Sequence, residues 1–350
     1  MNVGSRGTCH TTMMIVPTGV GAAIGGYAGD ALPVARAIAA VTDRLITHPN
    51  VLNGAQLYWP LANAYYVEGY GLDQFAAGRW HLQPVAQNAI GLVLDQAIED
   101  DLRWRHLQAV DAVRATLGLD IKGYVTTDAP LGVQLNQAQA ATWGTLTRPD
   151  SLLRAVAKLI DSGCTAIAVV ARFPDDEDSD ILQAYRQGSG VDPLAGAEAV
   201  ISHLVVREFQ LPCAHAPALQ PLPLDPKISP RSAAEEIGYT FLPCVLAGLS
   251  RAPQFKLQAD SDSMRSDHVN ALVVPASALG GSAVLSLSGT ATQIIAVGNN
   301  TTALAVGAQS LGLNVVEVSS YLEVVGAISA QRAGIALSAL TPRIEKVQPL

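Results

Sequence analysis

The sequence predicts an α/β protein with mostly parallel strands, and three observations lead to this fold class. Short apolar runs alternate with helix-like patterns along most of the 350 residues, as in sheets whose strands are joined by crossover helices. Glycine-rich turns follow several of these runs. Residues 269–316 contain no Asp, Glu, Lys or Arg, which is typical of segments covered on all sides. We therefore expect Rossmann-like open sheets flanked by helices, in two lobes with a cleft between them.

The first half of the chain contains runs that predict buried strands and patterns that predict helices. Asp150 is a favourable N-cap, and Gly118 and Gly163 are typical of residues that directly follow a helix. The expected strands cover residues 13–16, 45–46, 90–94, 124–126 and 166–170, and the expected helices run from 33 to about 45, from 99 to 117 and from 150 to 162.

The pattern weakens between residues 174 and 230, where an acidic run at 175–180 and a proline-rich stretch interrupt it. We place the division between the lobes in this region. Beyond it, expected strands at 271–274, 293–297 and 314–318 alternate with helices that begin at 281, 301 and 321. The expected organisation is a disordered tail at 1–12, an N-terminal α/β lobe at 13–190, a connecting region at 191–230, a C-terminal α/β lobe at 231–342 and a tail at 343–350.

Charge and cysteine content argue against several classes of protein. The formal net charge is −8 and no basic run occurs, so we expect neither a nucleic-acid partner nor an anionic membrane surface. The four cysteines lie far apart without a Cys-x-x-Cys pair, which predicts no disulfide framework and no metal site. The first twelve residues lack the apolar stretch of a secretory signal. We therefore expect a cytoplasmic protein.

The loop after the first expected strand is the first candidate for ligand binding. It contains Thr18, Gly19, Gly21, Gly25 and Gly26. Glycines allow backbone N–H groups to approach a phosphate or carboxylate closely, so this loop predicts binding of a small anionic metabolite. It matches neither the G-x-G-x-x-G fingerprint nor a P-loop. The alternative is a loop that needs small residues only for tight packing.

The loop after the second expected strand combines a histidine with two carboxamides. His48 supplies a group that titrates near neutral pH, and Asn50 and Asn53 supply fixed hydrogen-bond donors. We therefore expect His48 to be a catalytic acid or base, with a histidine that only caps a turn as the alternative. The other histidines, including His203 and His215, are less promising because they lie on helical faces, in the tail or in the proline-rich region.

A third polar turn ends the expected strand at 293–297 and opens the next helix. Asn299, Asn300, Thr301 and Thr302 would present N–H groups and hydroxyls where the helix dipole favours an anion. The expected helix at 301–311 has no charged face, so it would be covered by the other lobe or by a second subunit. The sequence therefore also predicts a homo-oligomer.

Charged residues near expected strand ends complete the candidate site. Asp30 and Glu317 are candidate catalytic acids, and Asp128 is a candidate ligand-binding carboxylate. Arg172, at the end of the strand at 166–170, is a candidate for holding an anionic substrate. Glu68 occupies a less certain position. No Ser-His-Asp elbow, H-E-x-x-H motif or Cys-His constellation is present, and no motif identifies a cofactor.

Three segments of the sequence resemble an uncharacterised family that is filed as a domain of unknown function and is found mainly in cyanobacteria and some photosynthetic eukaryotes. They are the glycine-rich loop at 17–31, the His48 loop at 47–53 and the residues at 66–70. The likeness covers nearly the whole chain, apart from the tail and the region after about Pro342. It implies a cytoplasmic setting and no particular reaction.

A shorter likeness concerns the turn at residues 298–303, Gly-Asn-Asn-Thr-Thr-Ala. It resembles the Gly-Asn-Thr-Thr turn of the nicotinate-nucleotide phosphoribosyltransferases of cobalamin synthesis. The acidic residues upstream in that family's motif are missing, since Ala296 and Val297 stand there. This likeness implies phosphoribosyl chemistry.

Two classes of function are compatible with these features. One is an enzyme of transferase or isomerase type that binds an anionic or phosphorylated metabolite on its glycine-rich strand-end loops. The other is a non-catalytic metabolite-binding or assembly protein that uses the same pocket. Both require the turns after Val16, Ile46 and Val297 to open onto one shared crevice.

Overall fold

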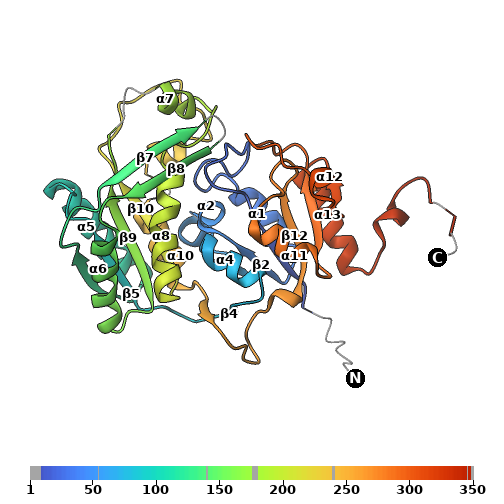
Figure 1. The fold of residues 1–350 in the computed structure, drawn as a ribbon, viewed down its shortest axis with the longest axis horizontal. Helices are drawn as coiled ribbons and strands as arrows, with labels where there is room; N and C mark the ends of the chain where they lie inside the picture. Colours follow the sequence, from blue (N-terminus) through green and yellow to red (C-terminus); the bar gives the residue numbers. More distant parts are fainter. Residues whose placement is uncertain are drawn as a thin grey trace.

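The structure, a computed structural model, describes residues 9–53, 55–138, 141–175, 180–238, 241–344 and 346–347. Most of the expected acidic run and parts of both expected tails lie outside these residues. Two parallel sheets flanked by helices form the body of the molecule (Figure 1). The predicted α/β class with mostly parallel open sheets is therefore confirmed.

The larger sheet has six strands in the order β14-β13-β12-β1-β2-β3, and all neighbouring strands are parallel. The charge-free segment supplies β12 and β13, whose residues are almost completely buried, as this composition predicts. The strands are β1 (Thr11–Met14), β2 (Arg44–Thr47), β3 (Ala64–Tyr66), β12 (Val269–Pro275), β13 (Gln293–Val297) and β14 (Val316–Val318).

Helices cover both faces of this sheet because side chains alternate between the two faces of each strand. Met14 of β1 packs with Ile38 and Ile328, whereas its neighbour Met13 packs with Phe75 and Leu287. The first face is covered by α1 (Leu32–Ala39) and α13 (Tyr321–Arg332), and the second by α4 (Gly69–Ala76) and α11 (Ser282–Ser288).

The smaller parallel sheet has four strands in the order β10-β9-β5-β6. Helices α5 and α10 pack with one face, and α6 and α8 with the other. The strands are β5 (Ile90–Leu94), β6 (Ile121–Thr126), β9 (Ala166–Arg172) and β10 (Cys213–Ala218); the helices are α5 (Asp100–Leu117), α6 (Pro149–Asp161), α8 (Ala195–Phe209) and α10 (Leu242–Ser250).

Two antiparallel strand pairs and several short helices complete the fold. The hairpin formed by β7 and β8 contacts α8, which lies beneath it in Figure 1. The pairs are β7 (Val133–Ala138) with β8 (Ala141–Leu146) and β4 (His81–Gln83) with β11 (Gln254–Lys256); the short helices are α2 (Pro49–Leu52), α3 (Ala55–Tyr58), α7 (Asp180–Arg186), α9 (Ala233–Glu236), α12 (Ala308–Leu311), η1 (Ser266–His268) and η2 (Leu337–Leu340).

The strands do not follow the expected grouping into residues 13–190 and 231–342. β1 from the start of the chain pairs with β12 from its last third, so the two ends of the sequence share the larger sheet. The strands of the smaller sheet come from the residues between them. Short apolar runs do not encode which run pairs with which, and this is why the sequence placed the division elsewhere.

Two local expectations are also corrected. β1 begins at Thr11, inside the expected tail, and its four residues are buried. The expected helix at 301–311 is shortened to α12, which begins at Ala308. The preceding backbone pairs with the glycine-rich loop instead, since the Ala303 N–H donates to the Val20 carbonyl at 2.8 Å. Within the described residues, no helix has the length and apolar character needed to cross a membrane.

Candidate functional site

The turns after β1, β2 and β13 lie side by side at one edge of the larger sheet. The Val16 N–H donates to His48 Nε2 at 3.1 Å, which joins the first two turns. The Ala23 N–H donates to the Thr301 carbonyl at 2.9 Å, which joins the first and third. These contacts agree with the rule that parallel strands bring their carboxyl ends to one edge.

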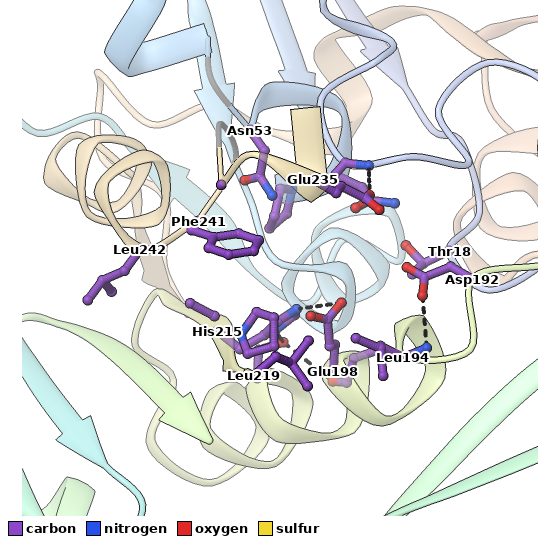
Figure 2. Close-up of a pocket in the computed structure, with 18 of the residues that line it drawn as sticks. Thr18, Asn53, Asp192, Leu194, Glu198, His215, Leu219, Glu235, Phe241 and Leu242 are labelled. Atoms are coloured by element: carbon purple, nitrogen blue, oxygen red, sulfur yellow. Dashed lines mark hydrogen bonds and ion pairs between the residues drawn. The ribbon is translucent and has the colours of Figure 1, made fainter. Parts of the chain in front are cut away.

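A cavity of about 830 Å³ opens at this edge (Figure 2). Its walls come from the ends of β1, β2 and β3 in the larger sheet and from the end of β10 in the smaller one. Helices α5 and α8 and residues 235–238 and 241–243 close the remaining sides. The volume is in the range of small-molecule sites, and its position is where open α/β sheets bind their ligands.

Four residues of the predicted site line this cavity, namely Thr18, His48, Asn50 and Asn53, and so does Glu68, which the sequence named in a less certain position. His48 begins α2, and its buried ring accepts the Val16 N–H. Burial lowers the pKa of His48 to about 4, so the ring is neutral near pH 7. Nε2 already accepts a hydrogen bond from the backbone, as expected of a histidine that only caps a turn. A catalytic role for His48 stays a prediction.

The glycines of the first loop are packed closely against neighbouring groups. A Cβ on Gly25, whose φ is +88°, would lie 2.7 Å from Val16 Cγ1, and a Cβ on Gly26 would lie 2.2 Å from the Ala22 carbonyl oxygen. A Cβ on Gly19 would lie 3.0 Å from Thr142 Oγ1. Tight packing therefore accounts for these three residues. A Cβ on Gly21 would likewise lie 2.8 Å from the Gly190 carbonyl oxygen, and Gly21 also lines a second hollow of about 580 Å³ together with Ser189, Ser229 and Arg231.

The turn after β13 braces the first loop rather than lining the cavity. Asn300 is fully buried; its Oδ1 accepts the Ile24 N–H at 2.8 Å, and its Nδ2 donates to the Ile24 carbonyl and to the Tyr321 hydroxyl. Thr302 contacts the Ser277 hydroxyl, while Asn299 and Thr301 are exposed.

The charged residues expected in the site are distributed over the molecule. Asp30 accepts the Gly25 N–H and forms an ion pair with Arg231 at 2.7 Å; burial raises the pKa of Asp30, and these contacts oppose the shift. Glu317 is exposed on the edge strand β14. Asp128 follows β6, Arg172 is the last residue of β9, and the two belong to separate ion-pair networks.

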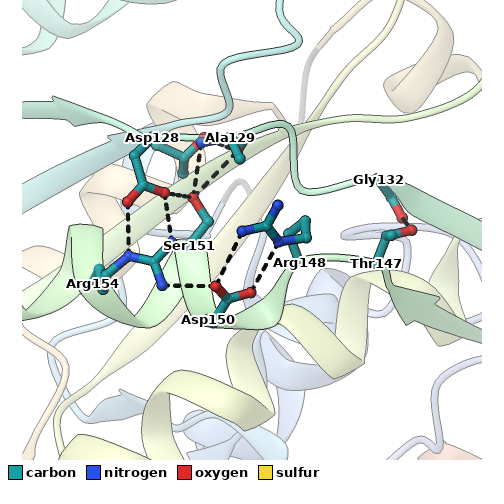
Figure 3. A network of polar contacts seen from close by, with 9 residues as sticks. Asp128, Ala129, Gly132, Thr147, Arg148, Asp150, Ser151 and Arg154 are labelled. Carbon is teal, nitrogen blue, oxygen red and sulfur yellow. Dashed lines mark hydrogen bonds and ion pairs between the residues drawn. The ribbon is translucent and has the colours of Figure 1, made fainter.

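Figure 3 shows the network around Asp128. Both carboxylate oxygens of Asp128 accept hydrogen bonds from the Arg154 guanidinium, which also pairs with Asp150 at 2.7 Å. Arg154 therefore holds the pKa of Asp128 well below its usual range. Arg172 is paired in the same way with Glu99 and Asp175. These side chains do not line the cavity.

Sequence reasoning missed the Glu68–His203 pair, which lines the cavity from two different elements. Glu68 is 3% exposed and caps α4, with its Oε2 accepting the Tyr70 and Gly71 N–H groups. Its Oε1 contacts Nδ1 of His203 on α8. Burial lowers the pKa of His203, but the hydrogen bond and charge of Glu68 outweigh this effect, so the net shift is upward.

Two further histidines of the cavity wall also have one ring nitrogen fixed by the protein. His215 Nδ1 contacts the Ser202 hydroxyl at 3.2 Å, and His106 Nδ1 contacts the Leu102 carbonyl at 2.7 Å. The sequence set these residues aside because they lie on helical or proline-rich segments. The sequence shows only how many histidines and carboxylates the chain contains. Which of them lie close together in the cavity depends on the fold.

Three carboxyl groups, those of Asp192, Glu198 and Glu235, line the same cavity (Figure 2). Asp192 accepts the Leu194 N–H at 2.8 Å, and Glu235 accepts the Tyr185 hydroxyl at 2.7 Å and the Ala28 N–H. Burial, together with the neighbouring carboxylates, raises the pKa of Asp192 well above its usual range and that of Glu235 to about 7. Among the described residues, no group of three or more His, Cys, Asp or Glu is arranged to hold a metal ion.

The fold and the cavity define an α/β protein whose parallel sheets surround a space of small-molecule size at their strand ends. The chain belongs to the family described as "Protein of unknown function (DUF3326)", which matches residues 11–341. A protein of Synechococcus sp. named as an uncharacterized lipoprotein is 60% identical over 339 residues, covering 96% of this chain and 94% of the relative. No solved structure matches the chain. The resemblance to an uncharacterised cyanobacterial family is therefore confirmed.

Proposed function

We propose that the protein is an enzyme that holds a small metabolite in the 830 Å³ cavity and transfers a proton through His203. The observation that carries this proposal is the Glu68–His203 contact in the cavity wall. Glu68 is buried and fixed by two backbone N–H groups, so it holds the His203 ring in one orientation. Such a carboxylate–histidine pair orients the imidazole and stabilises its charged form.

The chemistry available to this pair is proton transfer to and from a bound ligand. Glu68 lies against Nδ1 of His203, which leaves Nε2 for exchange with the substrate. The pKa of His203 is raised by its contact with Glu68, whereas burial lowers that of His48 to about 4. Isomerase and transferase reactions need a group of this kind.

The test is conversion of a metabolite panel by the full chain, followed by mass spectrometry. The panel contains amines, nucleotides, sugar phosphates and carboxylates. The His203→Gln and Glu68→Gln variants should lose about 100-fold or more of any turnover, as expected for loss of a general acid–base. In Glu68→Gln the pKa of His203, followed by NMR, should fall. His268→Gln, on an exposed histidine outside the cavity, is the matched control and should be unchanged.

Binding that is intact in these variants, with no turnover by the wild type, would overturn the enzyme proposal and favour the non-catalytic metabolite-binding or assembly protein. An anionic ligand group, as expected from the glycine-rich loop, has its best location in the second hollow. There Ser189, Ser229 and Arg231 accompany Gly21. Phosphoribosyl chemistry stays a prediction. In the turn that resembles the phosphoribosyltransferases, the Asn300 side chain is hydrogen bonded to Ile24 of the glycine-rich loop.

The homo-oligomer and the cytoplasmic location are also proposals. The expectation of an oligomer relied on an uncharged helix at 301–311, most of which is irregular backbone beside the glycine-rich loop. For location, the name of the Synechococcus relative, a lipoprotein, supports attachment to a membrane through a lipid as the competing proposal. Fractionation of cells into membrane and supernatant decides between the two locations.

A further inference from the structure

The carboxyl groups of the cavity come from separate parts of the chain and converge on one space. Asp192 precedes α8, Glu198 lies on α8 and Glu235 lies on α9. Figure 2 shows them around the same opening, with Thr18 beside Asp192 and with Phe241 and Leu242 at the other side of the view. The space therefore combines an acidic part with an apolar part.

The charges of the described lining residues are strongly unbalanced. Three acids have a cationic or titratable neighbour: Glu68 contacts His203, Glu198 lies 3.7 Å from His215, and Glu236 pairs with Arg186 at 2.8 Å. Asp192 and Glu235 accept hydrogen bonds from uncharged donors. The acids of the lining are Glu68, Asp73, Asp192, Glu198, Glu235 and Glu236, whereas Arg105 is the one Arg or Lys among its described residues.

A second observation in the same cavity concerns Asn53. Its Oδ1 atom is buried and accepts no hydrogen bond from the described residues, and the side chain lines the cavity. A buried acceptor without a donor costs about 1–3 kcal/mol. A ligand N–H group would remove this cost once the partly exposed Asn53 side chain rotates Oδ1 toward the cavity.

We infer that the ligand of this cavity carries a positively charged nitrogen, an ammonium or guanidinium group, that binds among Asp192, Glu198 and Glu235. Leu219, Phe241 and Leu242 contact the hydrocarbon part of the same ligand. The inference rests on the proposed small-molecule cavity and names its substrate class. A carboxylate or phosphate at this position would lie beside several acidic groups and be repelled by them. The anionic ligand that the glycine-rich loop suggested is thus excluded from the main cavity by this inference.

The test compares three probes that share one hydrocarbon chain and differ in the head group: hexylamine, 1-hexanol and hexanoate. Binding of each to the full wild-type chain is measured by isothermal titration calorimetry near pH 7.5. We expect hexylamine to bind at least about tenfold more tightly than hexanol, and hexanoate to bind more weakly than both. This comparison needs no variant, so it does not depend on whether a substitution is tolerated.

The variant Asp192→Asn/Glu235→Gln locates the head group. It should lose about tenfold of the affinity for hexylamine while keeping that for hexanol, because a bound ammonium favours the ionised form of these carboxyls and the amides cannot ionise. Glu198→Gln is the second variant, and Asp267→Asn, at an exposed aspartate outside the cavity, is the matched control. Thermal melting confirms that each variant is folded.

The outcomes separate this inference from the proposed function. If hexanol or hexanoate binds as tightly as hexylamine, the inference of a positively charged ligand is wrong, while the proposed small-molecule site in the cavity still stands. If hexylamine is preferred but both cavity variants bind it like the control, the cation binds elsewhere and the inference is overturned. If no probe binds, and the metabolite panel gives no binding either, the proposed function fails together with the inference.

Discussion

The strand ends of the smaller sheet and the cavity differ in how their charged groups are neutralised. At the ends of β6 and β9 of the smaller sheet, Asp128 and Arg172 form ion pairs with nearby residues of opposite charge. At the cavity, Asp192 and Glu235 are held by uncharged donors. A polar residue after a strand is therefore not sufficient to mark a site. What distinguishes the cavity is charge that the protein leaves without a compensating charge.

The pKa shifts have opposite directions in these two regions. Arg154 lowers the pKa of Asp128, whereas burial raises that of Glu235 to about 7. Asp128 therefore stays ionised from pH 4 to 8, whereas Glu235 titrates within this range. Substitutions that remove either kind of contact test this difference.

The largest effect is expected for Asn300→Ala, which removes the uncharged contacts that hold the cavity-side loop. The variant leaves the Ile24 N–H, the Ile24 carbonyl and the Tyr321 hydroxyl without their partner. At about 1–3 kcal/mol for each unsatisfied buried group, we expect a loss of about 4 kcal/mol in the free energy of unfolding. Urea denaturation measures it. The matched control is Asn299→Ala at the exposed neighbouring asparagine, and equal losses in both variants would contradict the bracing role.

The next effect is the pH dependence from His48. Its pKa is about 4 in the folded chain and 6.5 when exposed, so the folded state binds the proton less well. The contribution to stability is complete above pH 6.5 and is lost as the pH falls toward 4, by about 3 kcal/mol. His48→Gln, whose side-chain carbonyl can accept the Val16 N–H, should flatten this part of the curve. Parallel curves for the two proteins would show that His48 titrates normally.

Glu235 should give a dependence of opposite sign and at most similar size. Its pKa is raised from 4.5 to about 7, so the folded state binds the proton more tightly. Stability from this group is complete below pH 4.5 and is lost between pH 4.5 and 7, by at most about 3 kcal/mol because Asp192 titrates with it. Relative to wild type, Glu235→Gln should therefore gain stability as the pH rises from 4.5 to 8 in thermal melts. A constant difference between the two proteins would refute the shift.

The smallest effect is expected for Asp128→Asn in the outer network. Both partners are about half exposed, and exposed ion pairs contribute little because water and salt screen them. The loss in the free energy of unfolding, measured by urea denaturation, should be smaller than in the variants above. It should vanish in high salt and should not depend on pH between 4.5 and 8. A large, salt-independent loss would mean that the outer and cavity networks do not differ as described.

The sequence predicted the fold class and the edge of the sheet where the cavity opens. Thr18, His48 and Asn53 were found because short apolar runs locate strands, and the residues that follow them line the cavity. Local pattern also placed β5, β9, β12 and β13 within a few residues.

The missed features depend on contacts between distant parts of the chain. Thr11 and Asn270 are hydrogen bonded across 259 positions, and no local pattern predicts that pairing. His203 lies on α8, whose sequence pattern predicts only a helix, and the fold brings it to Glu68. In the same way, the polar turn at 299–302 was expected to open a helix and hold an anion, but no helix begins there and the Asn300 side chain is hydrogen bonded to Ile24 of the glycine-rich loop.

The central position of β1 also has a consequence for synthesis on the ribosome. β1 lies between β2 and β12, so the first strand to emerge acquires one of its two neighbours only when residues 269–275 have been translated. Until then an apolar strand edge stays open, and such edges promote association between nascent chains. Co-translational folding of this protein should therefore finish late, and chaperones that shield β1 during translation should increase its yield.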